Sequence, residues 1–120
     1  MRHGNNGKAA EKRVIDKYGL ERADVEWCDA TNPRTGARYE VKSASTSATR
    51  PRFRLWEDQH RSLTRAANHA AAWYVFVYGG EMTRRRPSTV TEVVNDRGGW
   101  NRSGHRRGAR QLKVPVEELL

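Results

Sequence analysis

The sequence predicts an α/β fold in which a central mixed β-sheet is flanked by helices. Three features lead to this prediction: an amphipathic segment at 7–18, a strand-turn-strand pattern at 25–44, and a continuous apolar run at 71–79. The run is too short for most helices and is rich in aromatic and β-branched residues, so we expect a strand that is buried on both faces. Such a sheet requires helices packed against it.

The length and composition indicate one domain. The chain has 120 residues, of which 36% are hydrophobic and 31% are charged, which is typical of a soluble domain with a modest core. We expect a single domain over 1–120, with a flexible N-terminus at 1–6. No apolar run reaches the ~20 residues of a membrane span, and the N-terminus lacks the apolar core of a signal peptide. The sequence therefore predicts a cytoplasmic protein without a membrane partner.

Two amphipathic segments are predicted to form helices. In the segment 7–18 apolar residues recur at helical spacing, and Gly19 follows where a helix is expected to stop. The segment 57–70 opens with acidic residues, which suit the N-terminal end of a helix, and continues with an apolar stripe. The apolar positions are Ala10, Val14, Ile15 and Tyr18 in the first helix, and Leu63, Ala66, Ala67 and Ala70 in the second.

Between these helices the sequence predicts strands. Residues 25–31 and 37–44 are expected to form the two arms of a hairpin. The turn between the arms contains Pro33, which presets one dihedral angle, and Gly36, which accepts a positive φ. The segment 50–56 is expected to be a third strand or an extended arm.

The C-terminal third has a less regular pattern. It contains a basic segment, several β-branched residues and a run rich in glycine and arginine. We expect, in order, a basic loop around Arg84–Arg86, a strand near 88–94, a glycine- and arginine-rich loop at 97–110, and a short final strand or helical turn.

The chain is strongly basic, with a formal charge of +9 and a pI near 10.4. A domain this basic usually binds a polyanion, most often nucleic acid, although a merely well-solvated surface is the alternative. Arginine outnumbers lysine, and its planar guanidinium group suits bidentate contacts to phosphate. The composition therefore favours a nucleic-acid partner.

Thiol chemistry and histidine-metal chemistry are disfavoured. Cys28 is the sole cysteine, so neither an intrachain disulfide nor a cysteine-based zinc site can form, and we expect a small buried residue rather than a nucleophile. The histidines show no paired ligand spacing. They are His3, His60, His69 and His105.

The hairpin carries charged residues whose positions can be counted. Alternation places Arg38, Glu40 and Lys42 on one face of the second arm and the residues between them on the other face, which alone is expected to be buried. If the turn is a four-residue loop, counting outward from it brings Asp29 opposite Glu40, with their Cβ atoms ~5 Å apart. Two carboxylates then face each other across the hairpin.

Facing carboxylates destabilise a sheet unless a cation compensates them. Lys42 is one candidate cation. Mg²⁺ is the other, because it binds through one or two carboxylates and takes its other ligands from water and phosphate, and both cations can be present together. The alternative is an exposed hairpin face on which Arg38 and Lys42 simply balance the acidic charges.

An aspartate on one arm of a hairpin, Glu-x-Lys on the other, a helix on each side and a further strand resemble the core of the PD-(D/E)xK nuclease superfamily. Here the residues are Asp29 and Glu40-Val41-Lys42. Within the superfamily the chain is most similar to the small archaeal-type Holliday junction resolvases and their viral relatives. The likeness covers about residues 7–79.

The resemblance implies a restriction-endonuclease-like core with the order helix, hairpin, strand, helix, strand. It implies a Mg²⁺-dependent DNA endonuclease that accepts Mn²⁺, needs no small-molecule cofactor and forms a homodimer, from a prokaryotic or viral source. Cutting that is specific for DNA structure, as at a Holliday junction, is one form of this activity. Two positions depart from the family pattern: Cys28 replaces the proline that usually precedes the first acid, and Asp24 is a rival for that acid.

By the same resemblance, Asp29 and Glu40 hold the metal with help from the Val41 carbonyl. Lys42 then orients the attacking water and helps to deprotonate it, or stabilises the pentavalent phosphate. A metal at this place lowers the pKa of bound water and offsets developing negative charge. The alternative function is a non-catalytic basic nucleic-acid-binding module, in which these side chains form only an ion network.

Two helix residues are expected to join the site. Glu11 shares a helical face with apolar residues, and resolvase-like enzymes place a glutamate of the first helix near the metal; the alternative is an ion pair with Arg13 or Lys8. Gln59 lies on the apolar side of the second helix, and the superfamily often has a helix glutamine in its active site. The alternative for Gln59 is a partly buried structural amide.

Basic residues elsewhere are expected to contact phosphate groups, which provides affinity without sequence readout. The candidate DNA-binding residues are Lys8, Arg50, Arg52, Arg54, Arg84, Arg85, Arg86, Arg102, Arg106, Arg107 and Arg110. We expect the loop at 97–110 to be mobile without DNA and to close on it. Trp100 is expected to anchor this loop on the core, with a contact to an exposed base as the alternative, and Trp27, Trp56 and Trp73 are expected in the core.

Overall fold

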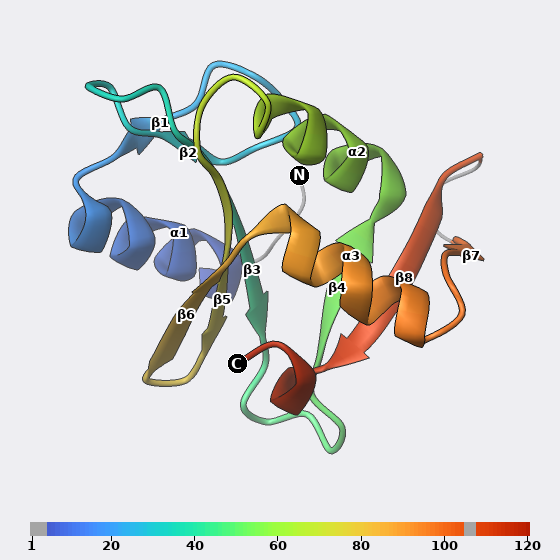
Figure 1. The fold of residues 1–120 in the computed structure, drawn as a ribbon. Coiled ribbons are helices and arrows are strands. Elements are labelled where there is room, and N and C mark those ends of the chain that lie inside the picture. Colours follow the sequence, from blue (N-terminus) through green and yellow to red (C-terminus); the bar gives the residue numbers. More distant parts are fainter. Residues whose placement is uncertain (1–4, 105–107) are drawn as a thin grey trace.

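The computed structural model describes residues 5–104 and 108–120, and Figure 1 shows the fold. None of the helices within these residues is long and apolar enough to span a lipid bilayer. In chain order the elements are α1 (Asn5–Tyr18), β1 (Glu21–Arg22), β2 (Ala30–Thr31), β3 (Arg38–Ala44), β4 (Arg52–Trp56), α2 (Glu57–Ala66), β5 (Ala72–Tyr78), β6 (Glu81–Arg85), α3 (Pro87–Asp96), β7 (Asn101–Arg102), β8 (Arg110–Pro115) and a 3₁₀-helix, η1 (Val116–Glu118).

The larger of two sheets is mixed, as the sequence predicts. Its five strands have the order β1-β2-β3-β5-β6, in which β3 and β5 are parallel and the other neighbours are antiparallel. A parallel pair needs a crossover connection, and here β4 and α2 provide it. The apolar run becomes β5, which is buried over most of its length because both faces of the sheet are covered.

The first helix covers one face of this sheet (Figure 1). Val14 of α1 packs in a buried cluster with Val41 of β3 and Val75 of β5. Gly19 follows the helix with a φ of 65°, a conformation that favours glycine, so the predicted helix stop is confirmed. The apolar spacing of α1 therefore places the helix against the side of β3 that carries Val41.

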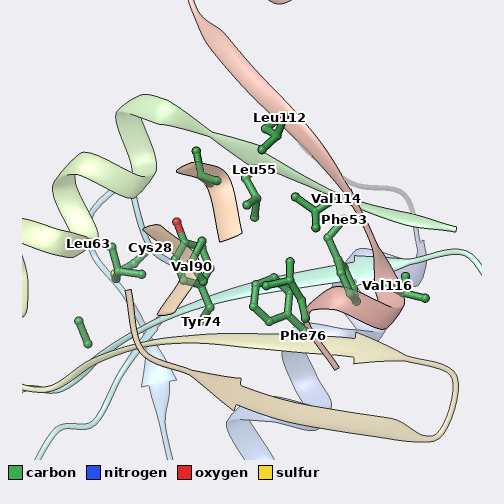
Figure 2. Close-up of a cluster of buried hydrophobic side chains, with 13 residues drawn as sticks. Cys28, Phe53, Leu55, Leu63, Tyr74, Phe76, Val90, Leu112, Val114 and Val116 are labelled. Carbon is green, nitrogen blue, oxygen red and sulfur yellow. The ribbon is translucent and has the colours of Figure 1, made fainter. Parts of the chain in front are cut away.

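The opposite face is covered by α2, α3 and a second, three-stranded sheet with the order β4-β8-β7. Figure 2 shows the cluster formed there, with Phe53 and Leu55 from β4 and Val114 from β8 beside Tyr74 and Phe76 of β5. The segment predicted as a third strand or extended arm is thus a strand, and it pairs with β8 near the C-terminus. The central strand β3 lies between this layer and α1.

Two predictions for the C-terminal third are wrong. The predicted strand near 88–94 is the helix α3: Pro87 is its first residue, where a missing N–H costs nothing, and Val90 and Val94 are buried at helical spacing. The β-branched composition favoured a strand, but packing against β5 and α2 decides for a helix. The predicted basic loop at Arg84–Arg86 is largely β6, whose last residue is Arg85 and which pairs antiparallel with β5.

Two predicted elements are also longer than the corresponding elements of the structure. The second helix ends at Ala66 rather than at residue 70, because the N–H groups of Asn68 and His69 bond to carbonyls three residues back and tighten the chain into turns. The first hairpin arm, predicted over 25–31, is a strand only at Ala30–Thr31. Before it the chain forms a loop, closed by a 3.0 Å bond from Ala23 N–H to the Asp29 carbonyl.

The predicted flexible regions are only partly described. Residues 1–4 and 105–107 lie outside the described residues, and α1 begins at Asn5, inside the predicted N-terminal tail at 1–6. Within the predicted loop at 97–110, Asn101–Arg102 form β7, which pairs with β8. The Ser103 N–H then bonds to the Ala109 carbonyl at 3.1 Å, so these two residues extend the pairing of β7 with β8.

Phe53 provides a test of the second core layer. Its ring is fully buried and lies 4.8 Å from the ring of Phe76, between centroids. We expect Phe53→Ala to lower the free energy of unfolding by about 3–5 kcal/mol, because it removes buried surface and leaves a cavity. Urea denaturation measures this loss. The control is Arg52→Ala at the exposed neighbouring position, and equal losses in both variants would contradict the assigned packing.

Candidate active site

The hairpin turn forms as the sequence predicts. The Asn32 Oδ1 atom accepts hydrogen bonds from the N–H groups of Arg34 and Thr35 at 2.9 and 3.2 Å, and Gly36 has a φ of 79°. The Asn32 N–H donates to the Ala37 carbonyl at 2.9 Å, which closes a four-residue loop. The strands continue with Ala30 opposite Tyr39. One further step of this count places Asp29 opposite Glu40.

Asp29 uses its side chain to continue the ladder where β2 has ended. Its Oδ2 atom accepts a 2.7 Å hydrogen bond from the Val41 N–H, and its own N–H donates to the Tyr39 carbonyl at 2.9 Å. The carboxylate, in a residue that is only 8% exposed, is therefore held against the edge of β3. The N–H and C=O of one residue point to the same edge of an antiparallel strand, so the Val41 carbonyl is directed to this edge as well.

Glu40 and Lys42 are buried, which corrects the prediction that only the other face of β3 is. Glu40 is 0% exposed and Lys42 is 4% exposed. The physical reason is the layer of α2 and the second sheet, which covers this face of β3 while α1 covers the other. The alternative prediction, an exposed hairpin face on which surface charges balance one another, is therefore wrong. The two side chains form an ion pair, with Lys42 Nζ 3.1 Å from Glu40 Oε2.

The second helix brings Gln59 to this pair. The Lys42 ammonium donates a 2.8 Å hydrogen bond to Gln59 Oε1, so the lysine is held by two oxygen atoms from different elements. Gln59 lies in the first turn of α2, directly after β4, and is half-buried. The structure therefore brings Gln59 of α2 together with Glu40 and Lys42 of β3, residues that the sequence places in two separate segments.

Glu11 has a different environment. It is buried on α1, and its Oε1 atom lies 3.4 Å from Arg22 Nη1. The ion pair is thus neither of the two that the sequence suggests, with Arg13 or Lys8. Within residues 5–104 and 108–120, no three Asp, Glu, His or Cys side chains are grouped closely enough to hold a metal ion. A role of Glu11 in catalysis stays a prediction.

A groove of about 1090 Å³ opens over Lys42 and Gln59. Its walls are rich in cations, and two tryptophans, Trp27 and Trp56, also line it. Both are half-buried. Trp27 also packs against the buried cluster, as predicted, whereas the predicted core position of Trp56 is wrong. Glu26 and Asp58 are its acidic lining residues. The cationic lining consists of Lys42, Arg50, Arg52, Arg54 and Lys113.

The candidate DNA-binding residues at the end of β6 and directly after it lie outside the groove. Arg84 and Arg86 stack over the Trp73 ring, with guanidinium carbons 4.0 and 4.7 Å from its centroid. Arg85 donates to the carbonyls of Leu119 and Leu120 at 3.0 and 2.8 Å, a contact that ties the C-terminus to β6. A contact of these arginines with DNA stays a prediction.

Three of the five remaining candidates lie on other parts of the described structure. Lys8 of α1 and Arg102 of β7 are exposed. Arg110 forms a bidentate pair with Glu57, at 2.9 and 2.7 Å, and the Arg110 hydrogen bond is the main cause that lowers the pKa of Glu57. Arg106 and Arg107 lie outside the described residues.

A chain of hydrogen bonds begins at Tyr74, next to Glu40, and leads away from the site. Tyr74, which neighbours Glu40 across the β3–β5 pair, lies 2.9 Å from His60 Nδ1, and His60 Nε2 lies 2.7 Å from Thr91 Oγ1. The Thr91 hydroxyl donates to the Pro87 carbonyl, so it accepts from His60 Nε2–H, and Nδ1 accepts from the tyrosine hydroxyl. Trp100 packs on the His60 ring at 5.7 Å, so its predicted anchoring role is confirmed.

Burial lowers the pKa of His60 below its usual 6.5. The unfolded chain therefore binds a proton that the folded chain does not, so stability is complete above about pH 6.5 and declines as the pH falls below it. We expect a slope of at most about 1.4 kcal/mol per pH unit. Urea denaturation between about pH 7 and pH 5 measures it.

The control for this pH effect is the exposed His69. We expect His60→Gln to flatten the pH dependence and to cost about 1–3 kcal/mol at neutral pH, because Tyr74 and Thr91 lose a hydrogen-bond partner. His69→Gln should change neither quantity. A pH slope that survives in His60→Gln would assign the effect to another group.

Burial also explains Cys28. It is 4% exposed, and desolvation raises its pKa to about 11, with a smaller opposing effect of Arg38. A thiol in this state is not a nucleophile at neutral pH. The prediction of a small buried residue is confirmed.

The donor atoms at the hairpin fit a hard divalent cation. Asp29 and Glu40 offer carboxylate oxygens, and Val41 offers a carbonyl at the same edge of β3. Mg²⁺ prefers such oxygen ligands and needs only one or two carboxylates, because water and phosphate complete its coordination. Two carboxylates are thus sufficient, and a third acidic residue is not required.

Comparison with known proteins agrees with this geometry. A family model described as "PD-(D/E)XK nuclease superfamily domain" matches residues 1–120. Among solved structures the chain is similar to Hjc of Archaeoglobus fulgidus, a Holliday junction resolvase from an archaeal hyperthermophile. The TM-score is 0.53 and the sequence identity 16%, over 96% of this chain and 95% of that chain. No curated protein matches the chain.

The two findings support different statements. At 16% identity, the likeness to Hjc shows a common fold, which confirms the predicted restriction-endonuclease-like core with a mixed sheet and flanking helices. The family model covers every residue, including the hairpin with Asp29, Glu40 and Lys42. The protein therefore belongs to the PD-(D/E)XK nuclease superfamily.

Proposed function

We propose that this protein is a Mg²⁺-dependent DNA endonuclease that hydrolyses phosphodiester bonds. The observation that carries the proposal is Lys42, an almost fully buried lysine held by Glu40 and Gln59 in a groove whose walls are rich in arginine. Burying a charged pair is unfavourable unless the geometry is excellent, and a fold alone does not need one. A cationic groove that leads to such a pair suits a phosphate substrate.

Each residue has a role that follows from its contacts. Lys42 orients the attacking water and takes part in its deprotonation, or stabilises negative charge on the phosphate in the transition state. Glu40 and Gln59 hold the lysine at their oxygen atoms. Asp29 accepts a hydrogen bond from the Val41 N–H, which holds its carboxylate in a constant position at the edge of β3.

Asp29 and Glu40, together with the Val41 carbonyl, are the ligands that we assign to the metal. Nucleases of this superfamily typically use divalent metals, and Mn²⁺ is expected to replace Mg²⁺. Bound there, the metal supplies Lewis acidity toward phosphate and lowers the pKa of water. Glu11, paired with Arg22 on α1, is retained as a candidate that acts near this site.

The finer proposal is a structure-specific enzyme of the Holliday junction resolvase type. The fold shared with Hjc supports it, as does the small basic domain. Paired cuts on branched DNA need two active sites, so we expect a homodimer with twice the 13.8 kDa mass of one chain. Light scattering measures this mass, and a stable monomer would favour nicking or end processing.

The activity is tested with labelled four-way junction, linear duplex and single strand, each incubated with Mg²⁺ or with EDTA. We expect metal-dependent cutting, and the preferred substrate decides between a resolvase and a general nuclease. Binding to all three without cutting in Mg²⁺ or Mn²⁺ would contradict the proposal. That outcome would favour a non-catalytic basic binding module.

A further inference from the structure

Trp56 differs from the other three tryptophans of the chain, all of which the structure describes. Trp27, Trp73 and Trp100 each pack against one of the two buried hydrophobic clusters, whereas Trp56 belongs to neither. It lines the groove over Lys42 instead. Its indole is therefore part of the groove wall rather than of either core cluster.

The strand that carries Trp56 explains its direction. Along β4, Phe53 and Leu55 are fully buried in the core, while Arg52, Arg54 and Trp56 alternate with them on the other face. This outer face lines the groove with all three side chains. The outer face of β4 therefore carries two cationic side chains followed by an indole ring.

Trp56 is also close in the chain to the proposed active site. It directly precedes α2, three residues before Gln59, whose Oε1 atom accepts from Lys42. The Arg54 guanidinium stacks near the Trp56 ring, 5.7 Å from its centroid. The groove therefore presents an aromatic ring and a cation side by side, next to Lys42, which is expected to contact the scissile phosphate.

A ring and a cation in this arrangement match a nucleotide whose base is unpaired. Bases stack on aromatic side chains when their faces are exposed, and arginine binds the phosphates that follow. In an intact duplex the faces of a base are covered by the neighbouring bases, so they cannot stack on a protein ring. Trp27 is a second aromatic residue of the same lining, two residues before Asp29.

We propose that Trp56 forms a base-stacking subsite that selects DNA with an unpaired nucleotide beside the cutting site. The occupant is a nucleobase on a strand whose phosphates contact Arg52 and Arg54. This inference rests on the proposed nuclease function for its biological meaning, but the subsite is a binding property. It is measured in EDTA, where cutting does not occur.

The test compares binding of two DNAs of equal length, a fully paired duplex and a duplex with a short unpaired bulge. We expect Trp56→Ala to weaken binding of bulged DNA by about 5- to 150-fold, the loss of one stacked base, and to leave binding of paired duplex unchanged. Trp56→Phe should retain most of the affinity. Fluorescence anisotropy measures both affinities.

The matched control is Trp73→Ala. Trp73 is also half-buried and also carries arginine side chains over its ring, but it lies outside the groove. In this variant the preference for bulged DNA should be preserved. Thermal unfolding of each variant establishes that it is folded before binding is compared.

A base analogue gives a second readout. With 2-aminopurine in the bulge, wild-type protein should quench its fluorescence by stacking, Trp73→Ala should do the same, and Trp56→Ala should not. The subsite would be overturned if Trp56→Ala weakened binding of both DNAs equally, or if this variant still quenched the 2-aminopurine fluorescence. A wild-type protein that does not prefer the bulged DNA would overturn it as well. If the protein stacks the base through Trp56 but never cuts DNA, only the proposed nuclease function is refuted.

Discussion

Lys42→Ala is expected to abolish cutting while DNA binding persists. The lysine is the residue to which the oxygens of Glu40 and Gln59 are directed, at 3.1 and 2.8 Å, and neither oxygen can replace its positive charge. Loss of a group that transfers a proton or stabilises charge at the phosphate lowers the rate by about 10²–10⁴-fold or more. Single-turnover cutting of labelled DNA in Mg²⁺ measures the rate.

The same substitution is expected to destabilise the fold. Removing one partner of a buried ion pair costs about 3–5 kcal/mol, because the other charge remains in a poorly solvated place. The double variant Glu40→Gln with Lys42→Met removes both charges and should recover most of this stability without recovering cutting. Urea denaturation and the cutting assay together separate the structural role of the pair from the catalytic one.

An exposed lysine is the control for Lys42. Lys12→Ala removes a surface cation that pairs with Asp16 on α1, so cutting and stability should both be retained. If Lys42→Ala cuts DNA at the wild-type rate, the proposed chemistry is wrong. If Lys42→Ala loses cutting together with stability, and both return in the double variant, the pair serves the fold alone.

Asp29→Asn is the second large effect. The asparagine Oδ1 atom can still accept the hydrogen bond from the Val41 N–H, which is 2.7 Å long in the structure, so the hairpin should stay folded. The negative charge is lost, and with it one of the two carboxylates of the proposed Mg²⁺ site. We expect loss of cutting by at least about 10²-fold, with DNA binding in EDTA unchanged or tighter because less negative charge faces phosphate.

Metal binding to this site can be followed without DNA. Mg²⁺ should raise the midpoint of thermal unfolding of the wild-type protein, since a ligand that binds only the folded state stabilises it, and should not do so in Asp29→Asn. The control is Asp24→Asn in the same loop, the rival acid in the sequence. Its carboxylate is largely exposed, 3.7 Å from Arg38, so this variant should keep both effects. The reverse result would move the metal to Asp24.

Local rules were enough to predict the hairpin and its register. Pro33 and Gly36 specify a tight turn, and the Asx-type bonds of Asn32 close it within a few residues. Since side chains alternate along a strand, the register then follows by counting, up to Asp29 beside Glu40. These interactions involve neighbours in sequence, which is why they can be derived without the fold.

Longer-range packing explains the errors. The segment Pro87–Asp96 contains several β-branched residues but is a helix, because Val90 and Val94 are buried against distant parts of the chain. The pairing of β4 with β8 joins segments about sixty residues apart, and no local pattern encodes it. The burial of Glu40 and Lys42 depends on that second sheet, so it was missed for the same reason.

By itself, the sequence determined the turn and the register of the hairpin, the positions of Asp29, Glu40 and Lys42 relative to that turn, and a charge high enough to bind a polyanion. Spacing, turn residues and charge are properties of the chain as written, and they act at short range. Only the tertiary structure decided that Gln59 reaches Lys42, that Glu11 pairs with Arg22, and that Trp56 lines the groove. These contacts form when separate elements pack together, and packing is set by the fit of whole surfaces rather than by any one segment.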